Sequence, residues 1–310
     1  MMRESPDRLQ MVFIIVVALA AVAVALIGSH IVDSSYEHVK EIKKTNIEES
    51  SDDISIDIVK SADDAKTILA KTTGAPNELR FTDQTITRAD LRLFVEKPSY
   101  TKLKILRCDF DSKDFDILKD SQIKVISMSD VPVDKTLIDY FAAIPKLGTI
   151  EMFRCAINPN ALGNLAVSKV RLVKFRKCGE NSDRVFTRAL VKDLARMESL
   201  VHAELSKNTF EEGALEAFAG AKCLVLNVSK TNASDSDLET FRRLPRLQYL
   251  DVDDCASITC KGLKELEQSS TLKQVRTTVP ASSCSFSGAA ISKFQHNHYR
   301  VPDEYQFEHD

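Results

Sequence analysis

The sequence predicts an α/β solenoid, in which short units of one strand and one helix stack side by side. Three observations carry this prediction. In LGTIEMFRCAI (147–157) and LQYLDVDDCAS (247–257), apolar residues occupy positions 1, 4 and 6, and cysteine occupies position 9. Copies of this frame recur along the chain at a nearly constant interval. Between the copies, the apolar spacing changes to that of a helix.

Seven further stretches share this frame: PNELRFTDQTI (76–86), YTKLKILRCDF (100–110), IKVISMSDVPV (123–133), VRLVKFRKC (170–178), LVHAELSKNTF (200–210), CLVLNVSKTNA (223–233) and LKQVRT (272–277). The starts lie about 24 residues apart on average. The alternation within a frame predicts a strand with one buried face, so that Leu250 and Val252 point inward while Tyr249, Asp251 and Asp253 point outward.

The second half of each unit predicts a helix. Leu238, Phe241 and Leu244 are spaced three residues apart, and Thr87 with Asp90 forms a capping-box pattern at one helix start. A single unit leaves its apolar face in water, so the units must stack. The parallel strands then form a curved sheet on the concave side, and the helices line the convex side.

These residues resemble the leucine-rich-repeat family, whose pattern is LxxLxLxxN/CxL. The resemblance covers about 76–294, as nine repeats, and is nearest to the helical repeats of ribonuclease-inhibitor type and of bacterial repeat proteins. It implies a binding surface on the concave face. The pattern departs from the family at position 9, which is Gln84, Val131 or Thr231 in some units.

Two units are longer than the rest. About seven extra residues near GENSDRVF (179–186) predict a protruding loop or a longer helix. The unit after Thr277 is stretched, and SFSGAAISKF (285–294) resumes its helical half. The polar segment 295–310 is expected to be a terminal cap or a loose C-terminal tail.

Residues 1–10 form a short amino-terminal tail, and residues 11–32 predict a transmembrane helix that serves as a signal anchor. Its core, MVFIIVVALAAVAVALIG (11–28), has no charged side chain and is about long enough to cross a hydrocarbon layer. A signal peptide cleaved near Ala23-Val24-Ala25 is the alternative, and a buried helix is disfavoured because no face is polar. The layout favours a single-pass membrane protein with its carboxyl-terminal domain exported.

Residues 33–75 predict a tether followed by a cap on the repeats. This stretch carries ten acidic and six basic residues. Ile54, Ile56 and Ile58 alternate as in a half-buried strand, and Ser61 begins a helix signature.

Composition excludes several function classes. The formal charge of −3 gives no basic stripe for nucleic acid. The patterns GxGxxG, GxxxxGK[ST], HExxH and GxSxG are absent, and no cofactor is predicted.

The seven cysteines are odd in number and form no CxxC pair. Four of them occupy position 9, namely Cys108, Cys155, Cys178 and Cys255. The family resemblance implies that this side chain turns inward and bonds the backbone of the turn, which makes a structural ladder. A disulfide between the neighbours Cys155 and Cys178, or a metal site, is the alternative. Cys260 and Cys284 fall in loops.

The outward strand positions are the candidate binding residues. They comprise a basic cluster of Arg154, Lys174, Arg176 and Lys177, an acidic cluster of Asp251, Asp253 and Asp254, and the nearby Phe153, His202, Glu204 and Tyr249. On such a face, charge steers a partner and aromatic residues anchor it.

The sequence therefore predicts a membrane-anchored protein that binds another protein through its concave face and is not an enzyme. A solvated face without a partner is the plain alternative. An envelope or cell-surface component that packs laterally or binds glycan is another alternative, and a hydrolase using His202 and Glu204 is a third. Two carboxylates on one strand, Asp251 and Asp253, are too few to favour calcium.

Overall fold

The chain divides into two units, 1–54 and 55–310. The computed structural model describes residues 56–59, 77–180, 184–287 and 291–294, together with 301, 302 and 305, all in the second unit. The predicted membrane segment 11–32, the tether and the helix signature at Ser61 lie outside the described residues. The strand predicted at Ile54–Ile58 is present as β1, Ile56–Val59.

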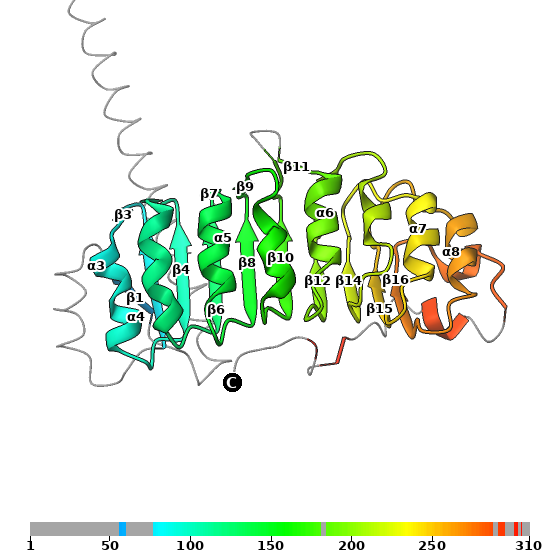
Figure 1. The fold of residues 1–310 in the computed structure, drawn as a ribbon. Helices are drawn as coiled ribbons and strands as arrows, with labels where there is room; N and C mark the ends of the chain where they lie inside the picture. The colour runs from blue at the N-terminus through cyan, green and yellow to red at the C-terminus, as the bar shows by residue number, and fades with distance from the viewer. Residues whose placement is uncertain are drawn as a thin grey trace, which may run out of the picture. The chain divides into compact units, whose positions relative to one another are not determined.

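A ten-stranded parallel sheet runs through the second unit (Figure 1). In spatial order it comprises β1, β2 (Glu78–Thr82), β4 (Lys102–Leu106), β6 (Val125–Ser129), β8 (Thr149–Phe153), β10 (Leu172–Arg176), β12 (His202–Glu204), β14 (Val225–Asn227), β15 (Tyr249–Asp251) and β16 (Gln274–Arg276). Each strand from β2 onward lies in one copy of the repeat, and neighbouring strands pair at equal frame positions. This arrangement confirms the α/β repeat solenoid.

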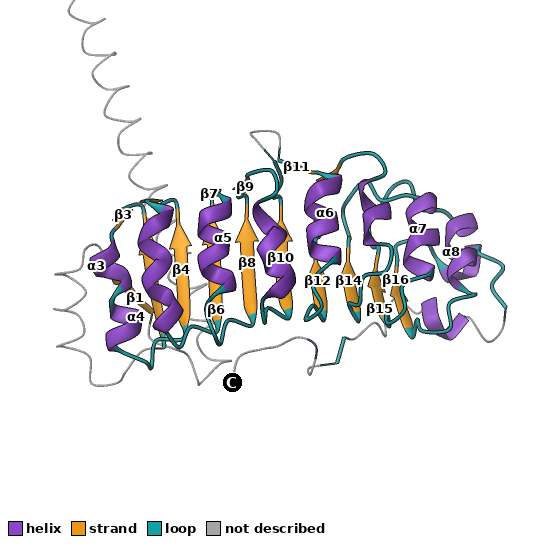
Figure 2. Cartoon of the chain, in the orientation of Figure 1, coloured by secondary structure: helices purple, strands orange, loops and turns teal. Residues whose placement is uncertain are grey.

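The helical halves cover one face of the sheet, in front of the strands in Figure 2. They are α3 (Arg88–Leu91), α4 (Leu93–Glu96), η1 (Ser112–Asp120), α5 (Lys135–Ala142), η2 (Ala161–Val167), α6 (Arg188–Ala195), η3 (Ala214–Phe218), α7 (Asp235–Arg242), α8 (Cys260–Leu266), η4 (Ala281–Ser283) and η5 (Ile291–Phe294). Short strand pairs follow the main strands in sequence, and β3, β7, β9 and β11 are labelled along the upper edge in Figure 1: β3–β5 (Thr85–Ile86, Asp109–Phe110), β7–β9 (Pro132–Val133, Ala156–Ile157) and β11–β13 (Val185–Phe186, Thr209–Phe210).

The helices alternate in type from unit to unit. The tight 3-10 helices η1, η2 and η3 alternate along the chain with the wider α-helices α5, α6 and α7, whereas the sequence pattern predicts a helix without this distinction. An α-helix with its side chains is about 10 Å wide, roughly twice the strand spacing of about 4.8 Å. A wide helix therefore fits behind every second strand, and the narrower 3-10 helix fills the place between.

The alternation ends where α7 and α8 pack directly against each other. Gly262 of α8 makes this contact possible, because a Cβ at that position would meet the Asp235 carboxylate at 2.2 Å and the Asp235 Cα at 2.9 Å. Asp235 also accepts hydrogen bonds from the backbone N–H and the hydroxyl of Thr259, the residue that caps α8.

The core lies between the sheet and the helices. Side chains at frame positions 4 and 6 point into it, as the alternation predicts, and Leu250 and Val252 are essentially fully buried. Phenylalanines from both layers fill the space, with Phe115 in edge-to-face contact with Phe110 and Phe141. Edge-to-face contact is a favoured geometry for aromatic pairs, so these rings join neighbouring units.

Eight successive strands of the large sheet, from β2 to β15, are followed by the same turn. The residue at position 8 has left-handed backbone geometry in eight successive units although none is glycine: Asp83, Arg107, Asp130, Arg154, Lys177, Lys207, Lys230 and Asp254. This geometry costs about 1–2 kcal/mol for a residue with a Cβ. A backbone hydrogen bond to the next unit offsets part of this cost. The N–H groups of Arg107 and Arg154 each donate to a carbonyl of the next unit at 3.0 Å.

Position 9 follows this turn and points into the core. Cys108, Cys155, Cys178 and Cys255 are buried free thiols whose Sγ atoms lie 3.2–3.8 Å from backbone carbonyl oxygens. Burial raises the pKa of Cys178 well above its ordinary value, which keeps it as the unreactive thiol.

Asn208 occupies position 9 between these cysteines and makes more bonds than any of them. Its amide nitrogen donates to the carbonyls of Phe175 at 2.7 Å and Leu205 at 2.8 Å, and its oxygen accepts from Cys178 N–H at 2.8 Å. One side chain thus ties β10 to β12.

Cys260 and Cys284, which the sequence places in loops, form a disulfide with their Cα atoms 5.2 Å apart. Cys260 in fact begins α8, and Cys284 follows η4 in the last unit. Their sequence separation of 24 equals the repeat length, so the two residues occupy adjacent places in adjacent units.

The insertion at 179–186 does not lengthen a helix. The helix that follows, α6, has eight residues, the same as α5 and α7. Instead Glu180 forms an antiparallel bridge with Val185. Residues 181–183 lie outside the described residues.

We predict that Asn208→Ala lowers the free energy of unfolding by on the order of 3 kcal/mol, because it leaves two carbonyls and one N–H buried without partners. Urea unfolding followed by circular dichroism measures this loss. Cys178→Ala, at the same frame position in the preceding unit, removes one weak S–H bond and is expected to cost about 1 kcal/mol. Equal losses for the two variants would contradict the role given to Asn208.

We predict that replacing both Cys260 and Cys284 by serine destabilises the last repeats by about 3 kcal/mol, since the bond closes a loop of 24 residues. Thermal unfolding of the full chain with and without a reducing agent tests this. The reductant should lower the Tm of the wild-type chain and leave that of the double variant unchanged. A wild-type Tm that ignores the reductant would refute the prediction.

Candidate functional site

The candidate site is the sheet face opposite the helices, here called the open face. It carries frame positions 3, 5 and 7, with position 8 along the edge where the strands end. Parallel pairing sets these positions in straight rows, so that Glu151, Lys174 and Glu204 of position 5 are direct neighbours on three strands. This is the face that the sequence predicts to bind a partner.

Ion pairs between adjacent strands organise the charges of the open face. They are Glu78 with Lys104 at 2.9 Å, Glu151 with Lys174 at 3.2 Å, Glu204 with Arg176 at 3.6 Å, and Arg276 with Asp251 at 3.6 Å and Asp253 at 3.2 Å. Partly exposed pairs of this kind contribute only about 0–1 kcal/mol each. Their main effect is to fix side chains and to neutralise charge locally.

The predicted basic cluster is therefore corrected. Lys174 and Arg176 are paired with carboxylates of the neighbouring strands, and Arg154 makes a two-pronged bond to Asp130 at 2.6 and 2.7 Å. Only Lys177 of the predicted four lacks an ion pair among the described residues. The sequence pattern of a single strand does not reveal these ion pairs, because each carboxylate lies about one repeat away from its cation in the sequence.

The edge row of position 8 shows the same pairing with one interruption. Asp83 bonds Arg107 at 2.6 Å, Asp130 bonds Arg154, and Lys230 lies 3.5 Å from Asp254. Between these pairs stand Lys177 and Lys207, both exposed, with no carboxylate within ion-pair distance in the part of the chain that the structure describes. The two residues are direct neighbours, because Cys178 and Asn208, which follow them, are hydrogen-bonded to each other.

Phe153 lies beside this interruption. The Arg154 guanidinium carbon stands 4.5 Å from the centre of the Phe153 ring, and Lys177 Nζ stands 6.0 Å from it. Cations at these distances are attracted to an aromatic face. Phe153 is half-buried, so the ring joins an apolar surface to the positive edge.

The far end of the open face differs from the prediction. His202, Tyr249, Asp251 and Asp253, predicted to face outward as binding residues, are 9%, 7%, 3% and 7% exposed. Two contacts contribute to this burial. Val301 and Tyr305 of the C-terminal segment pack against the apolar cluster that contains Tyr249, and the Arg276 guanidinium lies against both aspartates.

His202 and Glu204, the pair weighed as a hydrolase site, each have another partner. His202 Nδ1 lies 3.0 Å from the backbone oxygen of Tyr305, and burial lowers the pKa of its imidazole. The Glu204 carboxylate binds Arg176 at 3.6 Å and accepts a hydrogen bond from Ser206. Both contacts hold the side chains in place on the sheet.

Asp251 is an almost fully buried acidic group of the open face. Burial raises its pKa from 3.8 to about 6, although its carboxylate accepts the Asp253 N–H at 3.0 Å. Within the described ranges, no group of three or more histidine, cysteine or acidic side chains is placed to hold a metal ion. Arg276, which reaches both Asp251 and Asp253, supplies the positive charge at this end.

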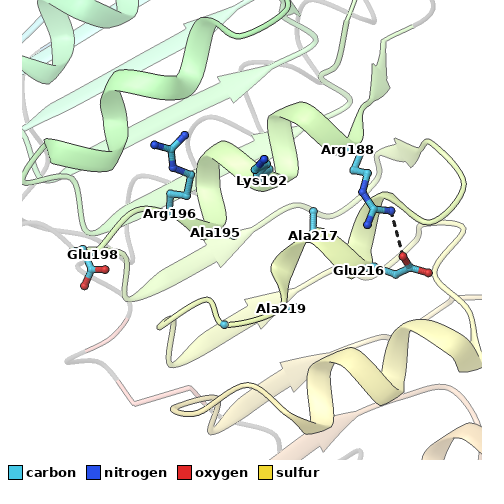
Figure 3. A pocket seen from close by; sticks show the side chains of 9 residues that line it. Arg188, Lys192, Ala195, Arg196, Glu198, Glu216, Ala217 and Ala219 are labelled. Carbon is cyan, nitrogen blue, oxygen red and sulfur yellow. Dashed lines mark hydrogen bonds and ion pairs between the residues drawn. The ribbon is translucent and has the colours of Figure 1, made fainter.

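A shallow depression of about 600 Å³ lies on the other side of the molecule, between α6 and η3. Figure 3 shows Lys192 and Arg196 along it and the ion pair of Arg188 with Glu216. Ala195, Ala217 and Ala219 also line it. None of the predicted binding residues lines it.

Some features of the site escaped sequence reasoning although a signal for them exists. Lys207 stands at position 8, next to Lys177, and the recurrence of the turn predicts that neighbourhood. Leu172 and Val225 are apolar residues at the outward position 3, which indicates a covered strip on the open face.

The described helices can be compared with the length and hydropathy that a membrane span requires. Among the residues that it describes, no helix is both long and apolar enough to cross a bilayer. The predicted span 11–32 is not among them.

Comparison with known proteins gives weak matches. No protein-family model matches the chain, and no curated protein sequence matches it significantly. One similar solved structure is an internalin (inlF) from Listeria monocytogenes str. 4b F2365, with 16% identity, a TM-score of 0.39, and coverage of 71% of this chain and 60% of that one. Another is a chain of an octameric complex of Latrophilin 3, Unc5D and FLRT2 (LRR), with 11% identity, a TM-score of 0.29, and coverage of 74% and 91%. At these scores, the fold is assigned from the structure itself.

We predict that Asp251→Asn stabilises the protein at about pH 7.5 by on the order of 1–3 kcal/mol, because the buried carboxylate is ionised there at a cost. The pKa of Asp251 is higher in the folded than in the unfolded chain. Wild-type stability from this group therefore rises as the pH falls through about 6 toward 3.8, and the advantage of the variant shrinks. Urea unfolding at several pH values measures the difference.

Asp130→Asn is the matched control for this titration. The bond from Arg154 lowers the pKa of Asp130 below 3.8, so its contribution is lost only in more acid solution. Its difference from wild type should stay constant between about pH 7.5 and 5. If the Asp251→Asn difference is equally constant, the raised pKa is refuted.

Proposed function

We propose that this chain is a membrane-anchored, non-catalytic leucine-rich-repeat protein, of the helical kind with about 24 residues per unit, that binds another protein through its open face. In the part of the chain that the structure describes, one long face of the sheet is not covered by helices, and it gives a partner many aligned side chains. The ion-paired rows hold those side chains in fixed positions before a partner arrives, which reduces the entropy lost on binding.

The observation that carries this proposal is the interruption in the edge row. Lys177 and Lys207 are exposed and lack carboxylate partners in the described part of the chain, whereas the position-8 residues before and after them are paired. Phe153 adds an aromatic surface alongside. Charged rims steer a partner and aromatic residues anchor it, so the fitting partner presents carboxylates around an apolar side chain.

Anchoring and export belong to the same proposal. The uncharged run 11–28 supports a membrane span. The disulfide Cys260–Cys284 supports an oxidising compartment for the repeats, since structural disulfides persist there and are rare in a reducing cytosol. The remaining thiols are buried, and burial protects them from oxidation.

The other functions considered receive less support. Glycan binding favours exposed aromatic platforms, and Tyr249, one of the two candidates, is buried. A hydrolase built on His202 and Glu204 would have to release both from their present bonds. Protein binding requires neither the exposure of Tyr249 nor the release of His202 and Glu204 from their bonds.

We predict that the double variant Lys177→Glu/Lys207→Glu weakens partner binding by about tenfold or more, with the loss mainly in the association rate and smaller at high salt. The full chain in detergent is used to capture a partner for identification by mass spectrometry. The affinity and rates are then measured with the purified partner by surface plasmon resonance.

Lys113→Glu/Lys119→Glu is the control, because it makes the same change of charge with exposed lysines of η1 on the helix side. The control should bind as the wild type does. Unchanged affinity in the Lys177/Lys207 variant would show that the open-face edge is not the binding site.

A further inference from the structure

A row of three cations borders the depression between α6 and η3, on the helix side of the molecule. Arg188, Lys192 and Arg196, here called the α6 row, are four residues apart and therefore stand on one face of the helix, about one turn from each other. All three side chains are exposed. Figure 3 shows them in line along the helix, with the alanines of the depression beside them.

The same row in the neighbouring α-helices contains an ion pair of its own. The helices α5, α6 and α7 have eight residues each, so they can be compared position by position. In α5 the row begins with the ion pair of Lys135 and Asp139 at 2.5 Å, and in α7 it ends with the ion pair of Glu239 and Arg243. Opposite charges four residues apart stabilise a helix, and like charges destabilise it. The α6 row therefore differs from its counterparts in the direction that costs stability.

The three cations of the α6 row are not equally compensated. Arg188 pairs with Glu216 of η3 at 3.1 Å. Lys192 and Arg196 have no carboxylate within ion-pair distance among the residues that the structure describes. Glu198, the other acid at the depression, has a lysine partner of its own. Two cations at one depression are thus left without a counter-charge.

The carboxylate of Asp193, which follows Lys192 in the chain, does not supply that charge. Asp193 is buried against η2, where a Cβ on Gly163 would stand 3.8 Å from both of its oxygens. The depression lies between α6 and η3, so this carboxylate is directed toward a different helix.

The side of the depression opposite the α6 row is lined by small residues. These are Ala217, Ala219 and Gly220, and the depression has a volume of about 600 Å³. A Cβ on Gly220 would meet no atom within 4 Å, so space remains open there. The preceding pair of helices differs, because Asn164 of η2 donates a hydrogen bond to Asp139 of α5 at 2.6 Å. A polar side chain therefore links α5 to η2, whereas alanines face the α6 row.

We propose that the depression beside the α6 row binds an acidic segment of a partner protein, with two carboxylates that pair with Lys192 and Arg196 and a small side chain that lies against the alanines. Charge complementarity supports this occupant. Four residues of an α-helix rise by about 6 Å, so the two carboxylates stand about that far apart.

The form of the depression favours a protein segment over a small molecule. Small-molecule sites bury most of the surface of their ligand, whereas a shallow depression leaves much of it in water. The inference rests on the proposed role in protein binding, and it adds a second surface that is separate from the open-face edge.

The test uses a fluorescent synthetic peptide, GEAAAEG, and its amide counterpart, GQAAAQG, with the full chain in detergent. The chain carries Lys177→Glu/Lys207→Glu, so that the open-face edge does not attract the peptide. Fluorescence polarisation should show that the acidic peptide binds about tenfold more tightly than the amide peptide or better, with an affinity that falls as the salt concentration rises.

A charge reversal and its control locate the binding. Lys192→Glu/Arg196→Glu, added to this chain, should reduce the affinity for the acidic peptide about tenfold or more, because both cations become like charges. Lys113→Glu/Lys119→Glu makes the same change of charge with exposed lysines of η1 and should leave the affinity unchanged. Circular dichroism confirms that each variant is folded.

The single variant Lys192→Glu separates a binding role from a structural one. It gives α6 opposite charges four residues apart, as in α5 and α7, so the Tm should rise by about 1–2 °C while the affinity for the acidic peptide falls. A lysine that serves only the stability of the helix would show a lower Tm after this substitution.

Three results would overturn the proposal. The acidic peptide binds no more tightly than the amide peptide. The Lys192/Arg196 and Lys113/Lys119 variants lose affinity equally, which means that the peptide follows the net charge of the chain. Or Lys192→Glu lowers the Tm, which makes Lys192 a structural residue. Because the peptide is measured on a chain whose edge lysines are reversed, this proposal can fail while the Lys177/Lys207 measurement of partner binding succeeds, and the reverse also holds.

Discussion

The stacking of the units depends on one turn, in which a left-handed residue at position 8 is followed by an inward side chain at position 9. The first continues the backbone ladder to the next unit, as Arg154 does, and the second bonds carbonyls that would otherwise be buried without partners, as Asn208 does. The same turn places the edge lysines. The backbone of the repeat fixes the positions of Lys177 and Lys207. The candidate site is therefore as rigid as the repeat.

Much of the fold follows from the sequence alone. The alternation around Leu250 and Val252 predicts the buried face of β15, and the Thr87–Asp90 pair forms the capping box that its spacing predicts. The type of each helix does not follow, because α and 3-10 geometry is decided by the width available beside the neighbouring unit. A search for closely spaced cysteine pairs does not find the disulfide either. Cys260 and Cys284 are one full repeat apart in sequence, and the stacking of the units brings them together.

The candidate site is less predictable than the fold, for two physical reasons. A charge on one strand reveals nothing of its partner on the next, so Arg154 and Lys174 read as free cations although Asp130 and Glu151 neutralise them. In addition, a segment at the end of the chain can cover residues far away in sequence. Tyr249 is outward-facing in its own strand, as predicted, and is nevertheless buried by contacts that include Tyr305.

The alternation of wide and narrow helices has a consequence for how such a chain can grow. If one unit were duplicated, two α-helices or two 3-10 helices would become neighbours, and the helix layer would no longer match the strands. Where α7 and α8 do adjoin, the contact requires a glycine, Gly262. The natural module of gain or loss is then a pair of units, roughly 48 residues at about 24 each. Lengthening this solenoid, by evolution or by design, proceeds most simply in steps of two.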